Sequence, residues 1–211
     1  MGTVVLVMGE SGSGKSTSLR NFSADEVGIF NVAGKPLPFK SSMKPMNVTK
    51  YAQEKNYSRY DVIKSMALKT DKKSIVIDDS QYLLAFESFD RAKETGFGKF
   101  TDIAVNIEKL VRFCVDSLPD DKIVYFLHHT ETSDTGKTKA KTIGKMLDSQ
   151  LTLEGLFSIV LLAQTDGKRH YFVTQSDGTT TAKSPMEMFD TEIDNDLKFV
   201  DQTIREYYNF T

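Results

Sequence analysis

The segment from Gly9 to Ser16 reads G-E-S-G-S-G-K-S and fits the phosphate-binding pattern G-x-x-x-x-G-K-[ST]. A short β-branched apolar run, Thr3–Val7, precedes it, and a helix-compatible segment, Lys15–Phe22, follows it. This strand–loop–helix context is the one in which the pattern binds phosphate. Its glycines let successive backbone N–H groups face one anion, and the start of the following helix adds partial positive charge there. The sequence therefore predicts a nucleoside triphosphate site.

Within this P-loop, each residue type has an expected role. Lys15 is expected to reach the β- and γ-phosphates, and the Ser16 hydroxyl is expected to ligate Mg²⁺. The residues expected to contact ATP are Gly9, Glu10, Ser11, Gly12, Ser13, Gly14, Lys15, Ser16 and Thr17.

Composition limits the class of protein. A length of 211 residues suits one domain, which we expect to span residues 1–211. No apolar run approaches twenty residues, so no membrane span is expected. The single cysteine, Cys114, excludes an intramolecular disulfide, which is typical of a reducing compartment. We therefore expect a cytoplasmic protein, in the host cell cytoplasm if it is encoded by a phage.

Apolar runs alternate with helical patterns along the chain, which predicts an α/β fold with a mainly parallel sheet flanked by helices. The predicted strands are Thr3–Val7, Val27–Val32, Ser74–Ile77, Ile123–His128, Phe157–Leu162 and His170–Thr174. The predicted helices are Lys15–Phe22, Tyr60–Thr70, Gln81–Ala92, Thr101–Ser117 and a C-terminal amphipathic helix, Ile193–Tyr208. Two long connections, residues 33–59 and 130–145, are predicted to be irregular loops.

A second nucleotide-binding motif lies where the predicted strand Ser74–Ile77 ends in Asp78 and Asp79. In P-loop enzymes an aspartate at this position holds Mg²⁺, and we assign that role to Asp78. Asp79 is expected to orient or deprotonate the attacking water. A separate strand, Val27–Val32, fits between the two motifs and favours the RecA-like (ASCE) branch of P-loop NTPases.

Two other P-loop classes fit less well. A Ras-like GTPase carries N-K-x-D for guanine recognition, and this sequence has no such segment. A nucleoside monophosphate kinase supplies several arginines from a lid, whereas the six arginines here are scattered along the chain.

Polar residues at the end of the strand Ile123–His128 are candidates for sensing the γ-phosphate. We assign this role to His128, with Thr130 as an alternative and His129 facing solvent. A lysine-rich segment follows, in which Lys137, Lys139 and Lys141 are expected to contact DNA phosphates.

This lysine-rich segment leaves three interpretations open. It is a solvated loop, a site for the backbone of single-stranded nucleic acid, or the source of a lysine that reaches the ATP of a neighbouring subunit. Lys145 and Lys183 are the two candidates for acting in trans.

Several of these segments together carry a family resemblance that covers nearly the whole chain. The sequence resembles a phage-encoded family of RecA-like P-loop ATP-binding proteins, and is similar to the single-strand annealing recombinases of the fourth Sak type. The segments that carry the resemblance are G-E-S-G-S-G-K-S-T at 9–17, N-V-A-G-K-P-L at 31–37, I-D-D-S at 77–80, H-H-T-E at 128–131, K-T-I-G-K at 141–145, K-S-P at 183–185, N-D-L-K at 195–198 and R-E-Y-Y at 205–208.

The resemblance implies ATP-modulated binding to single-stranded DNA, strand annealing or pairing in phage recombination, and rings or filaments with ATP between subunits. RecA places a catalytic glutamate after its second strand, whereas this chain has Asn31, Val32, Ala33 and Gly34 there. The catalytic role therefore falls to Asp79, and slow, DNA-stimulated hydrolysis is expected.

A second hypothesis comes from the distribution of charge. The net charge is −2, but residues 186–211 carry seven acidic side chains against Lys198 and Arg205. An acidic tail is also compatible with a nucleotide-gated module that hydrolyses little ATP and acts through a replication or regulatory partner, such as a helicase, a repressor or a phage single-strand-binding protein. A small-molecule kinase is a third reading, for which the sequence shows no acceptor site.

Overall fold

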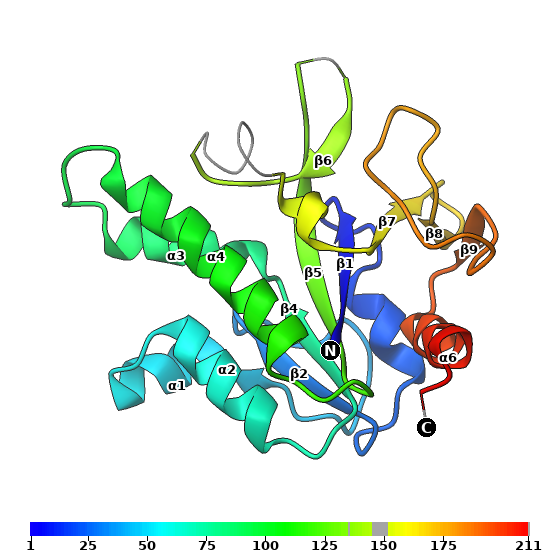
Figure 1. The fold of residues 1–211 in the computed structure, drawn as a ribbon, viewed down its shortest axis with the longest axis horizontal. Coiled ribbons are helices and arrows are strands. Elements are labelled where there is room, and N and C mark those ends of the chain that lie inside the picture. Colours follow the sequence, from blue (N-terminus) through cyan, green and yellow to red (C-terminus); the bar gives the residue numbers. More distant parts are fainter. Residues whose placement is uncertain (135, 145–151, 211) are drawn as a thin grey trace.

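The computed structural model describes residues 1–134, 136–144 and 152–210. Within this part of the chain the strands form one sheet in the order β3-β2-β4-β5-β1-β7-β8-β9, and β6 pairs with β5 outside that path (Figure 1). The strands are β1 (Thr3–Gly9), β2 (Val27–Asn31), β3 (Met46–Asn47), β4 (Ser74–Asp78), β5 (Ile123–Thr132), β6 (Thr138–Ala140), β7 (Ile159–Thr165), β8 (His170–Val173) and β9 (Glu192–Asp194). The helices are η1 (Ser16–Asn21), α1 (Val48–Lys55), α2 (Arg59–Lys69), α3 (Gln81–Asp90), α4 (Gly98–Asp116), η2 (Leu153–Leu156) and α6 (Leu197–Tyr208).

The sheet is mainly parallel. Strands β3, β2, β4, β5, β1 and β7 run in the same direction, whereas β8 and β9 add antiparallel at one edge. Strand β5 lies between β1, which leads into the P-loop, and β4, which ends in the two aspartates. This strand order confirms the predicted α/β RecA-like fold.

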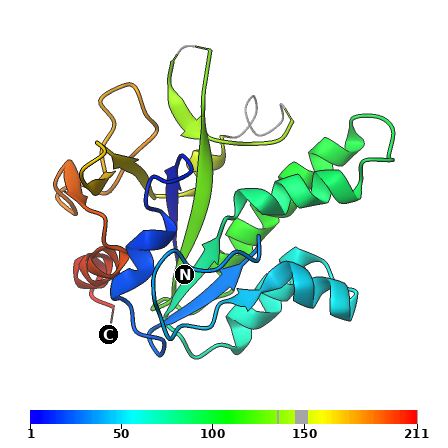
Figure 2. The same ribbon diagram turned by 180° about the vertical axis from the view of Figure 1, so that it is seen from behind.

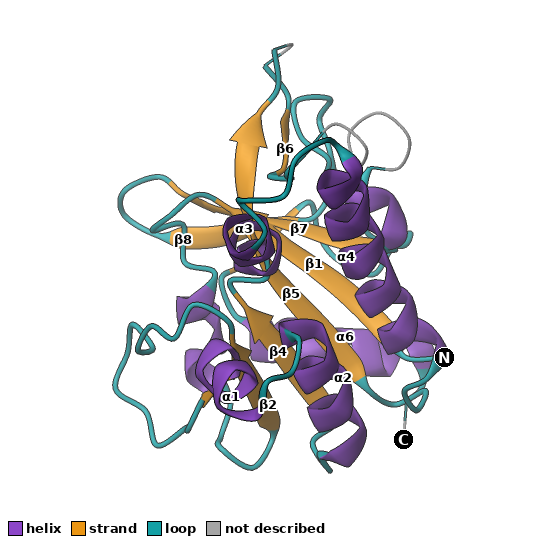
Figure 3. Ribbon diagram, turned by 90° about the vertical axis from the view of Figure 1, so that its left-hand side faces the viewer, coloured by secondary structure: helices purple, strands orange, loops and turns teal. Residues whose placement is uncertain are grey.

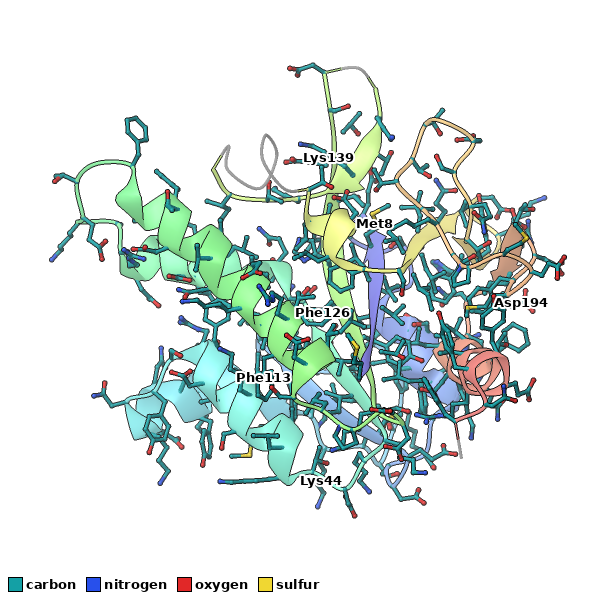
Figure 4. The ribbon with its side chains drawn as sticks, in the orientation of Figure 1. Met8, Lys44, Phe113, Phe126, Lys139 and Asp194 are labelled. Carbon is teal, nitrogen blue, oxygen red and sulfur yellow. The ribbon has the colours of Figure 1, made fainter. Side chains whose placement is uncertain are left out.

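Both faces of the central strands are buried, and this explains why they read as continuous apolar runs. Along β1, Leu6 and Met8 face a core covered by α1, α2, α3 and α4, while Val5 and Val7 face a second core closed by η1 and α6. Figure 3 shows the first group of helices in front of the sheet and α6 behind it. Phe126 packs in the first core, beneath α4 (Figure 4).

The C-terminal helix was predicted to begin at Ile193, and this start is wrong. Residues 192–194 form β9, which pairs with β8, and α6 begins only at Leu197. The Asp196 side chain accepts hydrogen bonds from the backbone N–H groups of Lys198 and Phe199, and so caps the helix there. From that point the helix is amphipathic as predicted, with Val200 and Ile204 buried.

Both connections predicted to be irregular contain regular structure. Residues 33–59 include β3 and α1, and the Asn47 side chain caps α1 by accepting from the backbone N–H of Lys50. Residues 130–145 include the end of β5 and its antiparallel partner β6, which form a projecting hairpin (Figure 2). The segment after the P-loop is a 3-10 helix of six residues, shorter than the predicted Lys15–Phe22. Among the described residues, no helix is long and apolar enough to span a bilayer.

Candidate nucleotide site

A pocket of about 240 Å³ opens at the carboxyl ends of the central parallel strands. This edge is where ligands bind in open α/β sheets. The pocket is lined by Ser11, Gly12, Gly14, Lys15, Ser16, Thr17, Lys35, Pro36, Pro38, Asp78, Asp79, His129 and His170. It therefore joins most of the predicted P-loop with both aspartates that follow β4.

Lys15 is held inside this pocket by the loop itself. Its ammonium donates to the carbonyl oxygens of Gly9 and Glu10, each at 2.8 Å, and only 6% of the residue is exposed. Burial lowers the pKa of Lys15 from 10.5 to about 8, although the charges of Asp79 and Asp78 oppose this effect. A bound polyphosphate would stabilise the protonated ammonium.

Gly14 has no room for a side chain. Its φ angle is +98°, and an added Cβ would lie 3.0 Å from the ring nitrogen Nδ1 of His170 and 3.1 Å from the amide of Asn195. A side chain here would therefore be strained by the turn and crowded by the His170 and Asn195 side chains.

The side chain of Ser16, after the P-loop, meets the side chain of Asp78, at the end of β4, as expected if both ligate Mg²⁺. Ser16 Oγ lies 2.9 Å from Asp78 Oδ1, and the Asp78 residue is 7% exposed. Burial raises the pKa of Asp78, and the adjacent charge of Asp79 raises it further. Hydroxyl and carboxylate oxygens suit Mg²⁺, which takes one or two protein ligands and completes its shell with phosphates and water. This donor pair fits the ion.

Asp79 lies in a left-handed turn and has two basic side chains beside it, those of Lys35 and His129. Its φ angle is +58°, its Oδ2 accepts from Lys35 Nζ at 3.0 Å, and its Oδ1 lies 3.2 Å from His129 Nε2. Burial alone would raise the pKa of Asp79, but the interactions with His129 and Lys35 outweigh it and lower the pKa to about 2. So acidic a carboxyl is a poor proton acceptor. Its chemistry favours orienting water over deprotonating it.

The two adjacent histidines have different surroundings from those expected. His128 is 1% exposed, and Ser80 Oγ lies 2.9 Å from its Nδ1 while the Lys141 carbonyl oxygen lies 2.8 Å from its Nε2. Burial lowers the pKa of His128 to about 4, so the ring is neutral near pH 7. A carbonyl oxygen only accepts, so Nε2 carries the proton, while the Ser80 hydroxyl beside Nδ1 also lies 2.9 Å from the Leu127 carbonyl oxygen. His128 does not line the pocket, whereas His129, expected to face solvent, does.

Sequence reasoning missed four further lining residues, Lys35, Pro36, Pro38 and His170. Lys35 follows β2, whose last residue, Asn31, is paired in register with Asp78. His170 begins β8, and its Nδ1 lies 3.1 Å from the Ser13 carbonyl oxygen. Lys35 lies in the N-V-A-G-K-P-L segment at 31–37, but nothing in that segment predicts a contact with the pocket, because Lys35 and His170 reach it only through pairing of distant strands.

The lysines predicted to contact DNA lie on the hairpin of β5 and β6. Lys137 and Lys141 are exposed, and Lys139 lies on β6, where its Nζ is 3.2 Å from a carboxylate oxygen of Glu131 (Figure 4). Lys183 is exposed beside β7, where its backbone pairs with Val160. Lys145, the other candidate for acting in trans, lies outside the described residues.

Strand order, P-loop and the paired Ser16 and Asp78 define a RecA-like P-loop fold, a class built to bind nucleoside triphosphates with Mg²⁺. No protein-family model matches this sequence, and no curated protein is similar to it at the sequence level. Among solved structures, the chain is similar to the KaiC-like protein PH0186 from the hyperthermophilic archaeon Pyrococcus horikoshii OT3. That similarity has a TM-score of 0.44 and 16% identity over 84% of this chain and 81% of the other.

Proposed function

We propose that this protein is a Mg²⁺-dependent ATPase that binds single-stranded DNA and promotes strand annealing or pairing in phage recombination. The observation that carries the proposal is the contact between Ser16 and Asp78 inside the P-loop pocket, because it brings both expected Mg²⁺ ligands to the place where phosphates bind. The residues expected to hold ATP are those of the P-loop, with Lys15 on the β- and γ-phosphates.

The pocket supports specific roles for its remaining polar groups. We assign Asp79 to orienting the attacking water, since in the free protein its low pKa makes it a weak base. We assign the γ-phosphate contact to His129 in place of His128, because His129 lines the pocket and His128 is buried with both ring nitrogens engaged. Slow hydrolysis follows from the lack of a strong general base.

The hairpin of β5 and β6 supports the DNA-binding part of the proposal. It projects beyond the sheet from the same strand that supplies His129 to the pocket (Figure 1). Its exposed lysines, Lys137 and Lys141, can contact phosphates without base readout, as sequence-independent annealing requires. Assembly into a ring or filament, with Lys145 or Lys183 reaching the ATP of a neighbour, belongs to the same proposal.

The second candidate is a nucleotide-gated module that acts through a protein partner with little hydrolysis. A specific feature favours it. Met186, Phe199 and Tyr207 are exposed within the acidic C-terminal region, on or beside α6. Apolar side chains exposed among acidic residues are typical of a surface that contacts a protein.

The two candidates are separated by annealing of complementary fluorescent oligonucleotides at a series of salt concentrations. Replacing Lys137, Lys139 and Lys141 with alanine is expected to reduce affinity for single-stranded DNA and to lower the slope of log affinity against log salt by about 2. A control variant with the same loss of charge replaces exposed lysines elsewhere, namely Lys40, Lys55 and Lys69. If wild type neither binds DNA nor anneals strands, the recombinase proposal is wrong and the partner-protein candidate takes its place.

A further inference from the structure

Lys35 is delivered to the nucleotide pocket by a turn that the Asn31 side chain holds at both ends. The Asn31 amide donates to the Lys35 carbonyl oxygen, and its own oxygen accepts from the backbone N–H of Gly34 at 2.6 Å. Gly34 has a φ of +70°, and an added Cβ would lie 2.5 Å from the Asn47 amide. The backbone at Lys35 is therefore fixed at the rim of the pocket.

The Lys35 side chain, in contrast, is free to change its partner. Its Nζ lies 3.0 Å from Asp79 Oδ2 and 4.7 Å from the centre of the Tyr82 ring, yet 58% of the side chain is exposed. Lys35 itself is exposed and can turn to another anion, and Asp79 keeps His129 Nε2 at 3.2 Å from its Oδ1 when Lys35 leaves. The ammonium already lines the same pocket as Lys15 and Ser16.

The charges of the pocket give Lys35 a better partner than Asp79 when a triphosphate is present. Lys15 is bound to the carbonyl oxygens of Gly9 and Glu10 at the P-loop. Lys35 lines the same pocket beside the carboxylate expected to orient water. A terminal phosphate placed between Ser16 and Asp79 would bring at least one further negative charge within reach of that ammonium.

We propose that Lys35 binds the terminal phosphate of a nucleoside triphosphate within its own subunit, and that this contact draws Lys35 away from Asp79. The inference rests on the proposed function and deepens it. Lys35 distinguishes triphosphate from diphosphate, and its departure leaves Asp79 able to hold the attacking water. The cation for the terminal phosphate is then supplied in cis, before any neighbouring subunit adds one in trans.

The test compares the binding of ATP and ADP, each with Mg²⁺, by calorimetry at a protein concentration low enough to keep the chain monomeric. Lys35→Ala is expected to weaken ATP binding at least tenfold and to change ADP binding less than twofold. Lys40→Ala, an exposed lysine of the same loop outside the pocket, is the matched control and is expected to alter neither.

A second variant tests the exchange of partners. Asp79→Asn removes the competing carboxylate, so it is expected to tighten ATP binding in the wild-type background and to have no such effect in the Lys35→Ala background. Equal weakening of ATP and ADP by Lys35→Ala, or unchanged binding of both, overturns the inference while leaving the proposed function standing. Failure of wild type to bind ATP better than Lys15→Ala does overturns both.

Discussion

Buried carboxylates lie at both ends of strand β4, and the two ends differ in the partners around them. At the amino end, Asp201 of α6 accepts from Ser74 at 2.7 Å, from the Tyr125 hydroxyl at 2.9 Å and from Arg205 at 2.7 Å. At the carboxyl end, Asp78 and Asp79 are adjacent like charges that face an open pocket.

This difference separates a structural clamp from a candidate site. The cavity at the amino end, about 370 Å³, is larger than the nucleotide pocket, yet its buried carboxylate is fully paired. Burial raises the pKa of Tyr125 well above its usual value, and the charge of Asp201 adds to the rise, so the hydroxyl stays a donor at all ordinary pH values. A buried carboxylate that accepts three hydrogen bonds from its own protein fastens α6 to the sheet. Asp78 accepts from Ser16 and lies beside the like charge of Asp79 at an open pocket, an arrangement that favours a bound cation.

The largest expected effect comes from breaking the clamp. Asp201→Ala leaves Arg205 and two hydroxyls without their acceptor, so we expect a loss of about 3 kcal/mol in the free energy of unfolding. Chemical denaturation measures it, with the exposed Glu206→Ala as a control that should change stability by less than about 0.5 kcal/mol. ATP affinity of the folded protein should be unchanged; an equal loss from Glu206→Ala would contradict the clamp.

Replacing Asp78, at the carboxyl end of β4, should have the opposite effects, with stability kept and ATP affinity lost. Asp78→Asn removes one of two adjacent like charges, so stability should stay equal or rise slightly. Affinity for ATP should fall about 100-fold in Mg²⁺, because a metal ligand is lost, and should barely change in EDTA. Calorimetric titration under both conditions checks this. A destabilised Asp78→Asn protein with normal Mg²⁺-dependent binding would mean that Asp78 is structural.

A smaller effect concerns pH. The pKa of Lys15 is about 8 in the free protein, and bound phosphates would raise this pKa. Above pH 8, where the free Lys15 side chain is neutral, ATP binding must therefore be coupled to uptake of a proton by Lys15. ATP affinity should therefore fall about tenfold between pH 7 and pH 9. Lys15→Arg, which keeps its charge throughout, should show a flat profile even if it binds more weakly. An equal fall in that variant would assign the titration to another group.

Local sequence predicted the parts of the site that depend on short-range chemistry. The P-loop and the aspartates after β4 each lie in one continuous segment, and their placement in one pocket follows from parallel strands ending at one edge. The part that local sequence could not place depends on strand register. Successive side chains of β5 point to opposite faces of the sheet, so only one of His128 and His129 reaches the pocket. Which one does is set by the register of β5 on β1, where Met8 pairs with His128 and Gly9 with His129.

Lys35 shows a second limit of sequence reasoning. Its contact with Asp79 spans 44 positions and arises because β2 pairs with β4. Nothing in the composition of residues 33–45 marks one lysine as different from Lys40 or Lys44. By contrast, the Asn47 cap of α1 was a signal present in the sequence, obscured by the nearby prolines.

The central claim is that the open carboxylate pair belongs to an ATP-hydrolysing site linked to DNA. The most direct measurement is the rate of ATP hydrolysis by purified wild-type protein, with and without single-stranded DNA, using Lys15→Ala as the blank. We predict a slow basal rate that rises several-fold with DNA and is absent in Lys15→Ala. A rate unaffected by DNA, or one that persists in Lys15→Ala, would contradict the account.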